Sequence, residues 1–337
     1  MMDLSTTYLG LQLAHPVVSS AGPLTATVDG VRALADGGAS AVVLHSLFEE
    51  ELRTRAARDA AIMDRNSDAF AESLDYFPDV QVSTQAEARS YLSLVERASA
   101  AVDVPVIASL NGSDIGGWTG FARQLQDAGA AAVELNIYLV PGDVFTDGSE
   151  VVLRHREIVR AVCDAVDIPV SVKLSPHFTS PGHMALTLLA DGAAGLVLFN
   201  RFLQPDVNVD DLSTDVGFDL SAPHEGRLPR TWIAALREHT RASLAGSTGV
   251  ETADDVVRYV LAGADVVMTT SSLVRNGPAH AGTLVAGLEE WLVRKGFDSL
   301  GAARGMLAVP GNVDADAHER GGYVQAIQRA KERYGAL

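Results

Sequence analysis

A short apolar run that stops at a polar residue recurs along this chain, each time after small residues that include Gly or Pro. A Gly just past a helix, followed by about five apolar residues, is typical of a parallel strand that is buried on both faces. The repeat therefore predicts a parallel sheet surrounded by helices. Its six clearest copies are Asp36–Leu44 before His45, Val104–Leu110 before Asn111, Ala128–Leu135 before Asn136, Ile168–Val172 before Lys173, Asp191–Phe199 before Asn200 and Ala262–Met268 before Thr269.

Two more strand candidates, Pro16–Ser20 and Ala242–Ala245, bring the series to eight. A (β/α)8 TIM barrel needs eight βα units and typically takes about 250 residues. The alternative, a doubly wound open sheet, leads with a Gly-rich fingerprint after its first strand, whereas the first turn here is Ser20–Pro23. The count favours the barrel. Helical patterns alternate with the strands at Trp118–Asp127, Val151–Ala165, Pro229–Arg241 and Thr252–Leu261.

Extra segments interrupt the regular spacing in two places. About residues 49–102 form an insertion after the second strand, and a long connection joins Phe199 to Ala242. Both lie in βα loops and thus over the active face of a barrel, as a lid or as an irregular surface loop. We expect residues 1–290 to form the barrel. Residues 291–337 would form a C-terminal helical extension packed on it, with amphipathic helices at His280–Lys295 and Tyr323–Tyr334 that contact the barrel or another subunit.

Composition narrows the class of protein. Hydrophobic residues make up 47% of the chain, yet no apolar stretch approaches the roughly 20 residues of a membrane helix, and no signal peptide is evident, so we expect a cytoplasmic protein. A net charge of -17 argues against a nucleic-acid partner. Cys163 is the one cysteine, so this chain alone builds no disulfide, Fe–S cluster or Cys-based zinc site, and we expect no metal.

In a TIM barrel the chemistry is assembled at the carboxyl ends of the strands, so the polar residue that ends each run matters. Lys173 is the most informative of them. Directly after a buried strand, its ammonium group would lie at the barrel mouth and would need an anionic or strongly accepting ligand. A structural ion pair with Glu134, on the neighbouring strand, is the alternative.

Amide side chains end three other strands, at Asn111, Asn136 and Asn200. Amides both donate and accept hydrogen bonds, which suits the edge of a heterocycle that carries imide or carboxylate groups. A single Asn would more often cap the following helix, but three at strand ends favour a ligand site.

Hydroxyl side chains and a Gly mark the seventh and eighth turns, Ser247–Gly249 and Thr269–Ser272. Backbone N–H groups at a helix N-terminus together with hydroxyl donors form an anion cradle, which these barrels commonly place after strands seven and eight. A plain capping role for Thr252 or Ser272 is the alternative.

Taken together, these motifs resemble the FMN-binding barrel of the dihydroorotate dehydrogenase family over about residues 4–290. The resemblance is closest to a dihydroorotate dehydrogenase-like branch. The motifs of the family are Pro16–Gly22, Leu44–Ser46, Val133–Asn136, Val172–Pro176, Phe199–Asn200 and Gly249 with Ala262–Ala264; those of the branch are Ser46–Glu50, Ser109–Gly112, Asn136–Tyr138 and Leu196–Phe202.

The resemblance implies FMN as the cofactor and assigns site residues. Lys173 matches a lysine beside flavin N1 and O2, where its charge would stabilise the anionic reduced flavin. Asn136 and Asn200 match substrate-binding positions. The expected cofactor-binding residues are Ser20, Ala21, Gly22, Ser46, Asn111, Asn136, Lys173, Thr248, Gly249, Thr270, Ser271 and Ser272.

The chain also departs from the family pattern. Catalytic members carry a Cys or Ser base three residues past the equivalent of Asn136, where this chain has Leu139, which cannot take a proton. Two residues further on, an expected Asn is Pro141. The expected substrate-binding Asn loop is not recognisable in Met63–Ser67. His45 stands where the family has a Lys, and Thr248 replaces the second Gly of the seventh turn.

Two other groups are candidates for the acid or base, namely His45, with an ordinary pKa near 6.5, and Tyr138, with one near 10 that would need a nearby cation such as Lys173. A base from the insertion, a hydride transfer that needs none, and no turnover at all are the other interpretations.

The sequence thus favours an FMN-dependent oxidoreductase that exchanges a hydride between flavin N5 and a small planar or carboxylated substrate. One alternative is a non-catalytic flavin- or ligand-binding barrel that acts as a partner subunit. Separately, contacts of the C-terminal helices with another subunit leave a homodimer open as an arrangement of the chain. Another is a true dihydroorotate dehydrogenase of pyrimidine biosynthesis with a relocated base. Without Fe–S ligands, the chain would pass electrons to a diffusible acceptor or to a separate electron-transfer partner.

Overall fold

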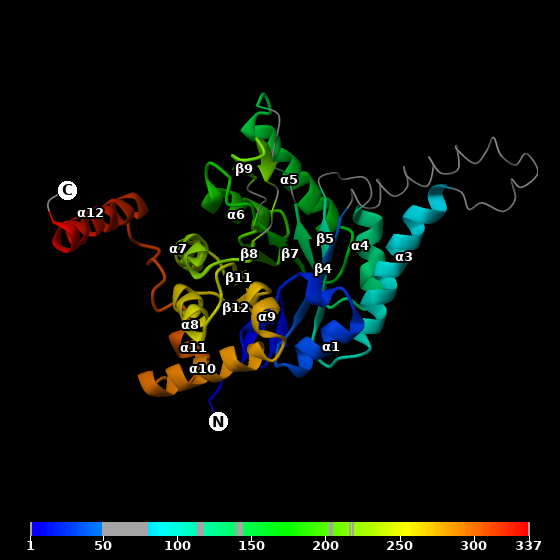
Figure 1. The fold of residues 1–337 in the computed structure, drawn as a ribbon, viewed down its shortest axis with the longest axis horizontal. Helices are drawn as coiled ribbons and strands as arrows, with labels where there is room; N and C mark the ends of the chain where they lie inside the picture. Colours follow the sequence, from blue (N-terminus) through cyan, green and yellow to red (C-terminus); the bar gives the residue numbers. More distant parts are fainter. Residues whose placement is uncertain are drawn as a thin grey trace, which may run out of the picture.

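Eight parallel strands form a closed barrel in the computed structural model, as the sequence predicts (Figure 1). The structure describes residues 2–48, 80–112, 118–137, 139, 144–201, 205–215, 217 and 219–335. Each strand falls within or beside a predicted apolar run, because a run apolar on both faces is buried on both faces. The barrel strands are β3 (Val17–Ser19), β4 (Val42–Phe48), β5 (Val106–Asn111), β6 (Ala132–Asn136), β7 (Val170–Lys173), β8 (Gly195–Leu198), β11 (Ser243–Ser247) and β12 (Val266–Thr269).

Helices follow the strands around the barrel. Two of the predicted helices, Trp118–Asp127 and His280–Lys295, begin and end where the sequence predicts, and the other predicted barrel helices shift by a few residues. Thr252 precedes α8, and its backbone N–H donates to the Asp255 carboxylate, so the capping alternative holds for Thr252. The helices around the barrel are α1 (Val28–Asp36), α3 (Val80–Ser99), α4 (Trp118–Asp127), α5 (Gly148–Cys163), α6 (Pro181–Ala190), α7 (Arg227–Leu236), α8 (Ala253–Ala262), α9 (Ser271–Asn276) and α10 (His280–Lys295).

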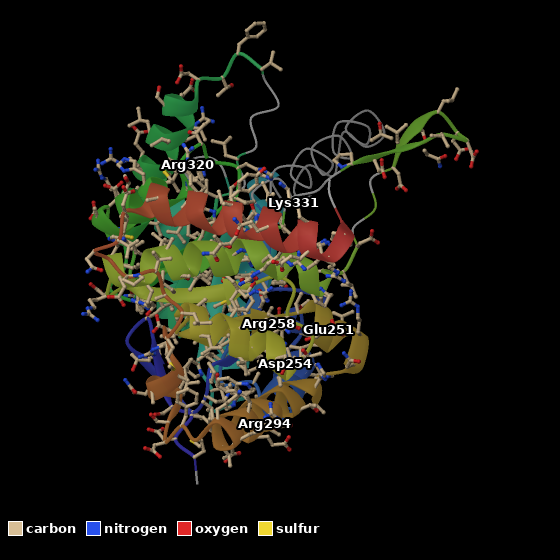
Figure 2. The ribbon with its side chains drawn as sticks, turned by 90° about the vertical axis from the view of Figure 1, so that its left-hand side faces the viewer. Glu251, Asp254, Arg258, Arg294, Arg320 and Lys331 are labelled. Carbon is tan, nitrogen blue, oxygen red and sulfur yellow. The ribbon has the colours of Figure 1, made fainter. Side chains whose placement is uncertain are left out.

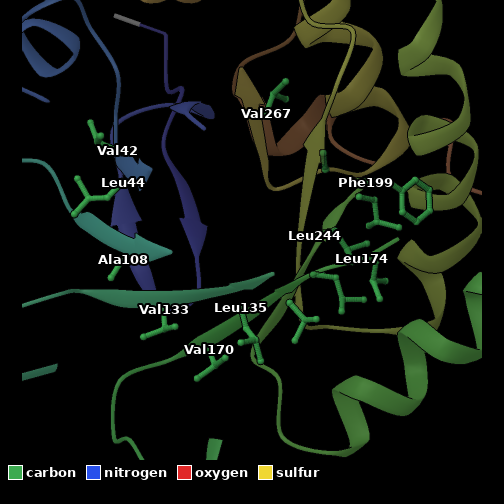
Figure 3. Packing of buried hydrophobic residues seen from close by; sticks show 14 of the residues in the cluster. Val42, Leu44, Ala108, Val133, Leu135, Val170, Leu174, Phe199, Leu244 and Val267 are labelled. Atoms are coloured by element: carbon green, nitrogen blue, oxygen red, sulfur yellow. The ribbon is translucent and has the colours of Figure 1, made fainter. Parts of the chain in front are cut away.

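Side chains alternate along each strand between the barrel interior and the helical layer. Outward side chains such as Val133, Leu135 and Val170 pack between strands and helices in the main hydrophobic cluster (Figure 3). The interior forms a second apolar cluster, and the antiparallel hairpin of β1 (Thr6–Tyr8) and β2 (Leu11–Leu13) contributes Tyr8, Leu9 and Leu13 to it. The hairpin therefore closes one end of the barrel.

Polar residues take over the interior toward the other end. The strand registers align Asn111 with Asn136, and Asn136 with Lys173. One layer deeper, Ser109 aligns with Glu134, and Glu134 with Ser171. All six side chains are buried. Parallel register thus gathers residues that are far apart in sequence at the strands' carboxyl ends.

The long connection after β8 contains a hairpin of β9 (Asp206–Asn208) and β10 (Ser213–Asp215) and a short 3-10 helix at Pro223–Gly226. The other predicted insertion lies outside the described residues as far as residue 79, and its last part forms α3. Its interpretation as a lid stays a prediction.

The C-terminal part adds α11 (Leu300–Ala303) and α12 (Ala315–Tyr334). Leu284, Leu288 and Leu292 of α10 are buried, and α10 packs against α8. By contrast, α12 stands away from the barrel helices in Figure 1, and its Tyr323 and Tyr334 are exposed. Charged side chains such as Arg258 on α8 and Lys331 on α12 are labelled in Figure 2. No helix among the described residues is long and apolar enough to cross a bilayer.

Candidate active site

A cavity of about 140 Å³ opens at the carboxyl ends of the barrel strands. Eight of the residues expected from sequence to bind cofactor or substrate line it, so the structure brings together side chains from the first, fifth, sixth, seventh and eighth βα turns. These are Ser20, Ala21, Lys173, Asn200, Thr248, Gly249, Thr270 and Ser271.

Lys173 is the buried cation in the lining of this cavity. Its Nζ is 3.4 Å from Glu134 Oε1 and 3.5 Å from Ser20 Oγ, and its side chain is 9% exposed. The ion pair with Glu134, given above as the alternative, is therefore present. An ammonium group has three donors, and both contacts are long, so Lys173 keeps the capacity to bind a ligand in the cavity it lines.

Asparagine side chains meet beside Lys173. Asn200 Nδ2 donates to Asn136 Oδ1 at 2.9 Å. Asn136 also lies in register between Asn111 and Lys173. Asn200 lines the cavity, whereas the buried Asn111 and Asn136 support it from the strand ends. The pair presents amide donors and acceptors next to a cation.

The seventh and eighth turns also line the cavity. Thr248 and Gly249 both have positive φ, +80° and +67°. A Cβ on Gly249 would lie 2.5 Å from the backbone N of Gly226, so only glycine fits there. Thr270 Oγ1 is buried and has no hydrogen-bond partner among the described residues. Hydroxyl groups and close backbone approach are the features of an anion cradle.

Tyr259, on α8, holds the seventh turn from behind. Its hydroxyl is within hydrogen-bonding distance of the Ser247 and Thr248 carbonyls, at 2.8 and 2.7 Å, and donates to them. Burial raises the pKa of Tyr259 far above its ordinary value, so the hydroxyl keeps its proton and stays a donor.

The second turn lies apart from the cavity. His45 and Ser46 do not line it. Ser46 Oγ and Ser109 Oγ are 2.8 Å apart, and the Tyr91 hydroxyl donates to the His45 carbonyl at 2.8 Å. Gly22 and Ser272 are close to the lining without forming it: Gly22 abuts Thr270, and Ser272 Oγ pairs with Thr269 Oγ1 at 2.9 Å.

Four of the positions compared above with the family pattern lie in the turn after β6 and in the insertion. Tyr138, Pro141 and Met63–Ser67 lie outside the described residues. Leu139 is described, half-buried and packed against the hydrophobic core.

The comparison with known protein families decides which barrel this is. A family model described as dihydroorotate dehydrogenase matches residues 3–292. The chain belongs to this family. The expected flavoprotein oxidoreductase class is thereby confirmed at the level of the dihydroorotate dehydrogenase family.

Individual relatives in the dihydroorotate dehydrogenase family are distant. The catalytic subunit of dihydroorotate dehydrogenase B (NAD(+)) from Thermoplasma acidophilum is 25% identical over 305 residues, covering 89% of this chain and 97% of that protein. Dihydroorotate dehydrogenase A (fumarate) from Lactiplantibacillus plantarum is 30% identical over 210 residues, 59% of this chain and 67% of that one. The NAD-dependent dihydropyrimidine dehydrogenase subunit PreA of Escherichia coli is 26% identical over 215 residues, covering 59% of this chain and 52% of that protein.

Two residues of the long connection, Arg201 and Ser221, also line the first cavity, although they were not among the site residues expected from the sequence. Ser221 is buried, its Oγ accepts from Gly249 N at 3.3 Å, and its N donates to Ser271 Oγ at 3.1 Å. Arg201 follows Asn200 and binds Glu225 at 2.9 Å. Ser221 carries no local signal because its role depends on two distant turns. Arg201 was visible as a charge directly after a strand-end Asn.

A second cavity of about 440 Å³ adjoins the first and shares Phe199, Asn200, Arg201 and Thr248 with it. His177 and His224 also line it. Asn200 thus lines both cavities, whereas Lys173 lines the first.

Proposed function

We propose that this protein is an FMN-dependent oxidoreductase that exchanges a hydride between flavin N5 and a small planar or carboxylated substrate. The observation that carries the proposal is the lining of the first cavity. It brings a buried cation, Lys173, together with the cradle of the seventh and eighth turns. Membership in the dihydroorotate dehydrogenase family supports the oxidoreductase class, and the residues that line the cavity supply a cation and an anion cradle that suit the cofactor.

The cradle end fits a phosphate group. Gly249 lets the Ala222–Gly226 backbone pack against the seventh turn, and the buried Thr270 hydroxyl has no partner among the described residues and is free to donate. Ser221 and Ser271, tied to each other through backbone and hydroxyl groups, add polarity to the same wall. We infer that Thr248, Gly249, Thr270 and Ser271 would hold the FMN phosphate.

The other end fits the polar edge of the flavin ring. Lys173 would face the N1 and O2 side, with Ser20 and Ala21 beside it. Bound FMN would supply the ring that takes up the hydride. The contribution of Lys173 is to stabilise the negative charge that the ring gains on reduction, from a position fixed before reaction.

The Asn200–Asn136 pair is the proposed substrate contact. Its amides lie beside Lys173 and open toward the second cavity, so they would orient a substrate that carries imide or carboxylate groups. The half-buried Leu139 supplies no proton acceptor at the position where the family carries a base. This departure supports a substrate other than dihydroorotate.

The electron acceptor is proposed to be separate from this chain. A sequence with one cysteine builds no Fe–S cluster by itself, so electrons would pass to a diffusible acceptor or to a partner protein. The names of two relatives, a catalytic subunit and a subunit, support a partner for this chain as well.

Purified protein titrated with FMN tests the proposal. We expect stoichiometric binding with the absorption of a protein-bound flavin, and we expect Lys173→Ala to weaken it at least tenfold. A protein that leaves added FMN free in solution would contradict both the oxidoreductase and the flavin-holding alternative.

Anaerobic addition of dihydroorotate to the FMN-loaded protein separates the remaining interpretations. We expect the flavin to stay oxidised. Rapid bleaching of the flavin would instead identify a true dihydroorotate dehydrogenase with a relocated base. Reduction by another carboxylated or imide-bearing compound from a substrate panel would exclude the flavin-holding subunit without turnover.

A further inference from the structure

Glu134 differs from the other buried carboxylates that the structure describes. It is 0% exposed, one cation forms its ion pair, and its Oε2 has no hydrogen-bond partner among the described residues. Each of the other buried carboxylates is paired with two arginines. These pairs are Asp191 with Arg156 and Arg160, Asp255 with Arg230 and Arg258, and Asp265 with Arg237 and Arg304.

Glu134 is enclosed by the barrel on every side but one. Its strand register places it between Ser109 and Ser171, in the layer below Asn136 and Lys173. The hairpin residue Tyr8 lies beneath, and burial, with the charge of Glu134 as the next cause, raises the pKa of that phenol. Among the described residues Lys173 is its ion-pair partner, and Lys173 lines the cavity.

A buried carboxylate with an unsatisfied oxygen is costly, and a hydrophobic residue of similar volume would often stabilise the fold more. Stability therefore does not account for Glu134. Its one ion-pair contact, 3.4 Å from Lys173 Nζ, links it to the candidate active site.

We propose that Glu134 is a positioning residue of the flavin site, and that it sets the reduction potential of the bound flavin through Lys173. This inference rests on the proposed function. Glu134 holds Nζ at the barrel mouth and offsets part of its positive charge. The flavin ring then faces an ion pair rather than an isolated cation.

The sign of the effect follows from electrostatics. Reduction adds negative charge to the ring, and a cation that is not offset stabilises that charge more strongly than an ion pair does. Removing the charge of Glu134 while keeping its shape should therefore favour the reduced flavin. The midpoint potential should rise.

The test is the midpoint potential of the FMN-loaded protein, measured by equilibration with a redox dye. We expect Glu134→Gln to shift it to higher potential by about 30 mV or more, which is a tenfold change for a two-electron couple. Asp265→Asn is the matched control, because Asp265 is a buried, paired carboxylate at the start of β12 that does not line the cavity. We expect it to leave the potential unchanged.

A double-mutant cycle with Lys173→Gln tests whether Glu134 acts through the lysine. In that background, Glu134→Gln should raise the potential by less, because there is no Nζ for Glu134 to hold in place. Glu134→Asp keeps the charge but withdraws it from Nζ, and it should raise the potential by less than Glu134→Gln does. This variant also serves if Glu134→Gln does not fold.

An unchanged potential in Glu134→Gln, or in Glu134→Asp where only that variant folds, would overturn the inference and leave the proposed function standing. An equal shift with and without Lys173 would overturn it as well. Failure of the wild-type protein to bind FMN is a separate outcome, which would overturn the proposed function itself.

Discussion

Thr270 lies directly against Gly22, where the eighth turn of the barrel meets the first. A Cβ on Gly22 would overlap Thr270 Oγ1 and lie 3.2 Å from Thr270 Cβ. Gly22 itself is in extended backbone with φ 174°, so the need for glycine at this position is one of space and not of conformation.

Gly22→Ala should therefore displace Thr270 from the cavity wall. We expect FMN affinity to fall by about tenfold or more and the free energy of unfolding to fall by roughly 1–3 kcal/mol, as for other overpacked sites. Fluorescence titration and urea denaturation measure the two effects. In the Gly22→Ala/Thr270→Ala double variant the lost stability should return in part; if it does not, the contact with Thr270 is not the cause.

Gly249→Ala should damage the seventh turn more severely. The added Cβ would meet the backbone N of Gly226 at 2.5 Å and the Ala222 carbonyl at 3.0 Å, and backbone cannot move aside as a side-chain end can. We expect loss of FMN binding and destabilisation by more than about 2 kcal/mol.

Gly277 is the matched control for Gly249. It also has positive φ, +83°, but an added Cβ would have nothing within 4 Å. Gly277→Ala should cost only the conformational penalty of roughly 1–3 kcal/mol and leave FMN affinity intact. Equal FMN affinities in the two variants would show that the close approach at Gly249 does not matter for the cofactor.

Two buried tyrosines allow stability and binding to be separated. The Tyr259 hydroxyl supports the seventh turn, and the Tyr91 hydroxyl supports the ends of β4 and β5 through the His45 and Ser109 carbonyls. Each Phe variant leaves buried carbonyls without their donor, which costs roughly 1–3 kcal/mol.

We therefore expect Tyr259→Phe and Tyr91→Phe to lower the free energy of unfolding by similar amounts in urea denaturation. Only Tyr259→Phe should also weaken FMN binding, by about tenfold. If Tyr91→Phe weakened FMN binding equally, the second turn would belong to the cofactor site after all.

His15 should make stability depend on pH. Burial lowers the pKa of His15 to about 4 in the folded protein. In the unfolded chain it returns to about 6.5, so between these values the unfolded chain binds the proton and the folded chain does not. The free energy of unfolding should fall as pH drops from about 6.5 to about 4, by at most roughly 3 kcal/mol.

Urea denaturation across that pH range measures the His15 contribution. His15→Gln should lose less stability on acidification than the wild-type protein, because no imidazole remains to take up the proton. Parallel curves for the two proteins would contradict the assignment.

Apolar pattern predicted the barrel because every barrel strand is buried on both faces. The same pattern did not predict the β1–β2 hairpin, whose Thr6–Leu13 segment mixes polar and apolar residues over two strands of three residues each. The two strands are joined by a turn at Leu9 and Gly10, both with positive φ, and Gly10 is the residue in the sequence that favours such a turn.

The candidate site could be predicted only where a residue ends a strand. Lys173 and Asn200 were found in this way. Ser221 and Tyr259 could not be, since their hydrogen bonds reach turns that are close only after the barrel closes. His45 also ends an apolar run, but it lies within β4, its carbonyl accepts from the Tyr91 hydroxyl of α3, and its ring packs edge-on against Tyr91, with centroids 5.2 Å apart.

The β1–β2 hairpin, which closes one end of the barrel, affects how water and protons reach the interior. Tyr8, Leu9 and Leu13 are all almost fully shielded from solvent. The hairpin therefore shields the interior of the barrel from solvent at this end, and Lys173 lies toward the other end. A flavin bound beside Lys173 would cover Glu134 and the serines of its layer from the mouth side as well.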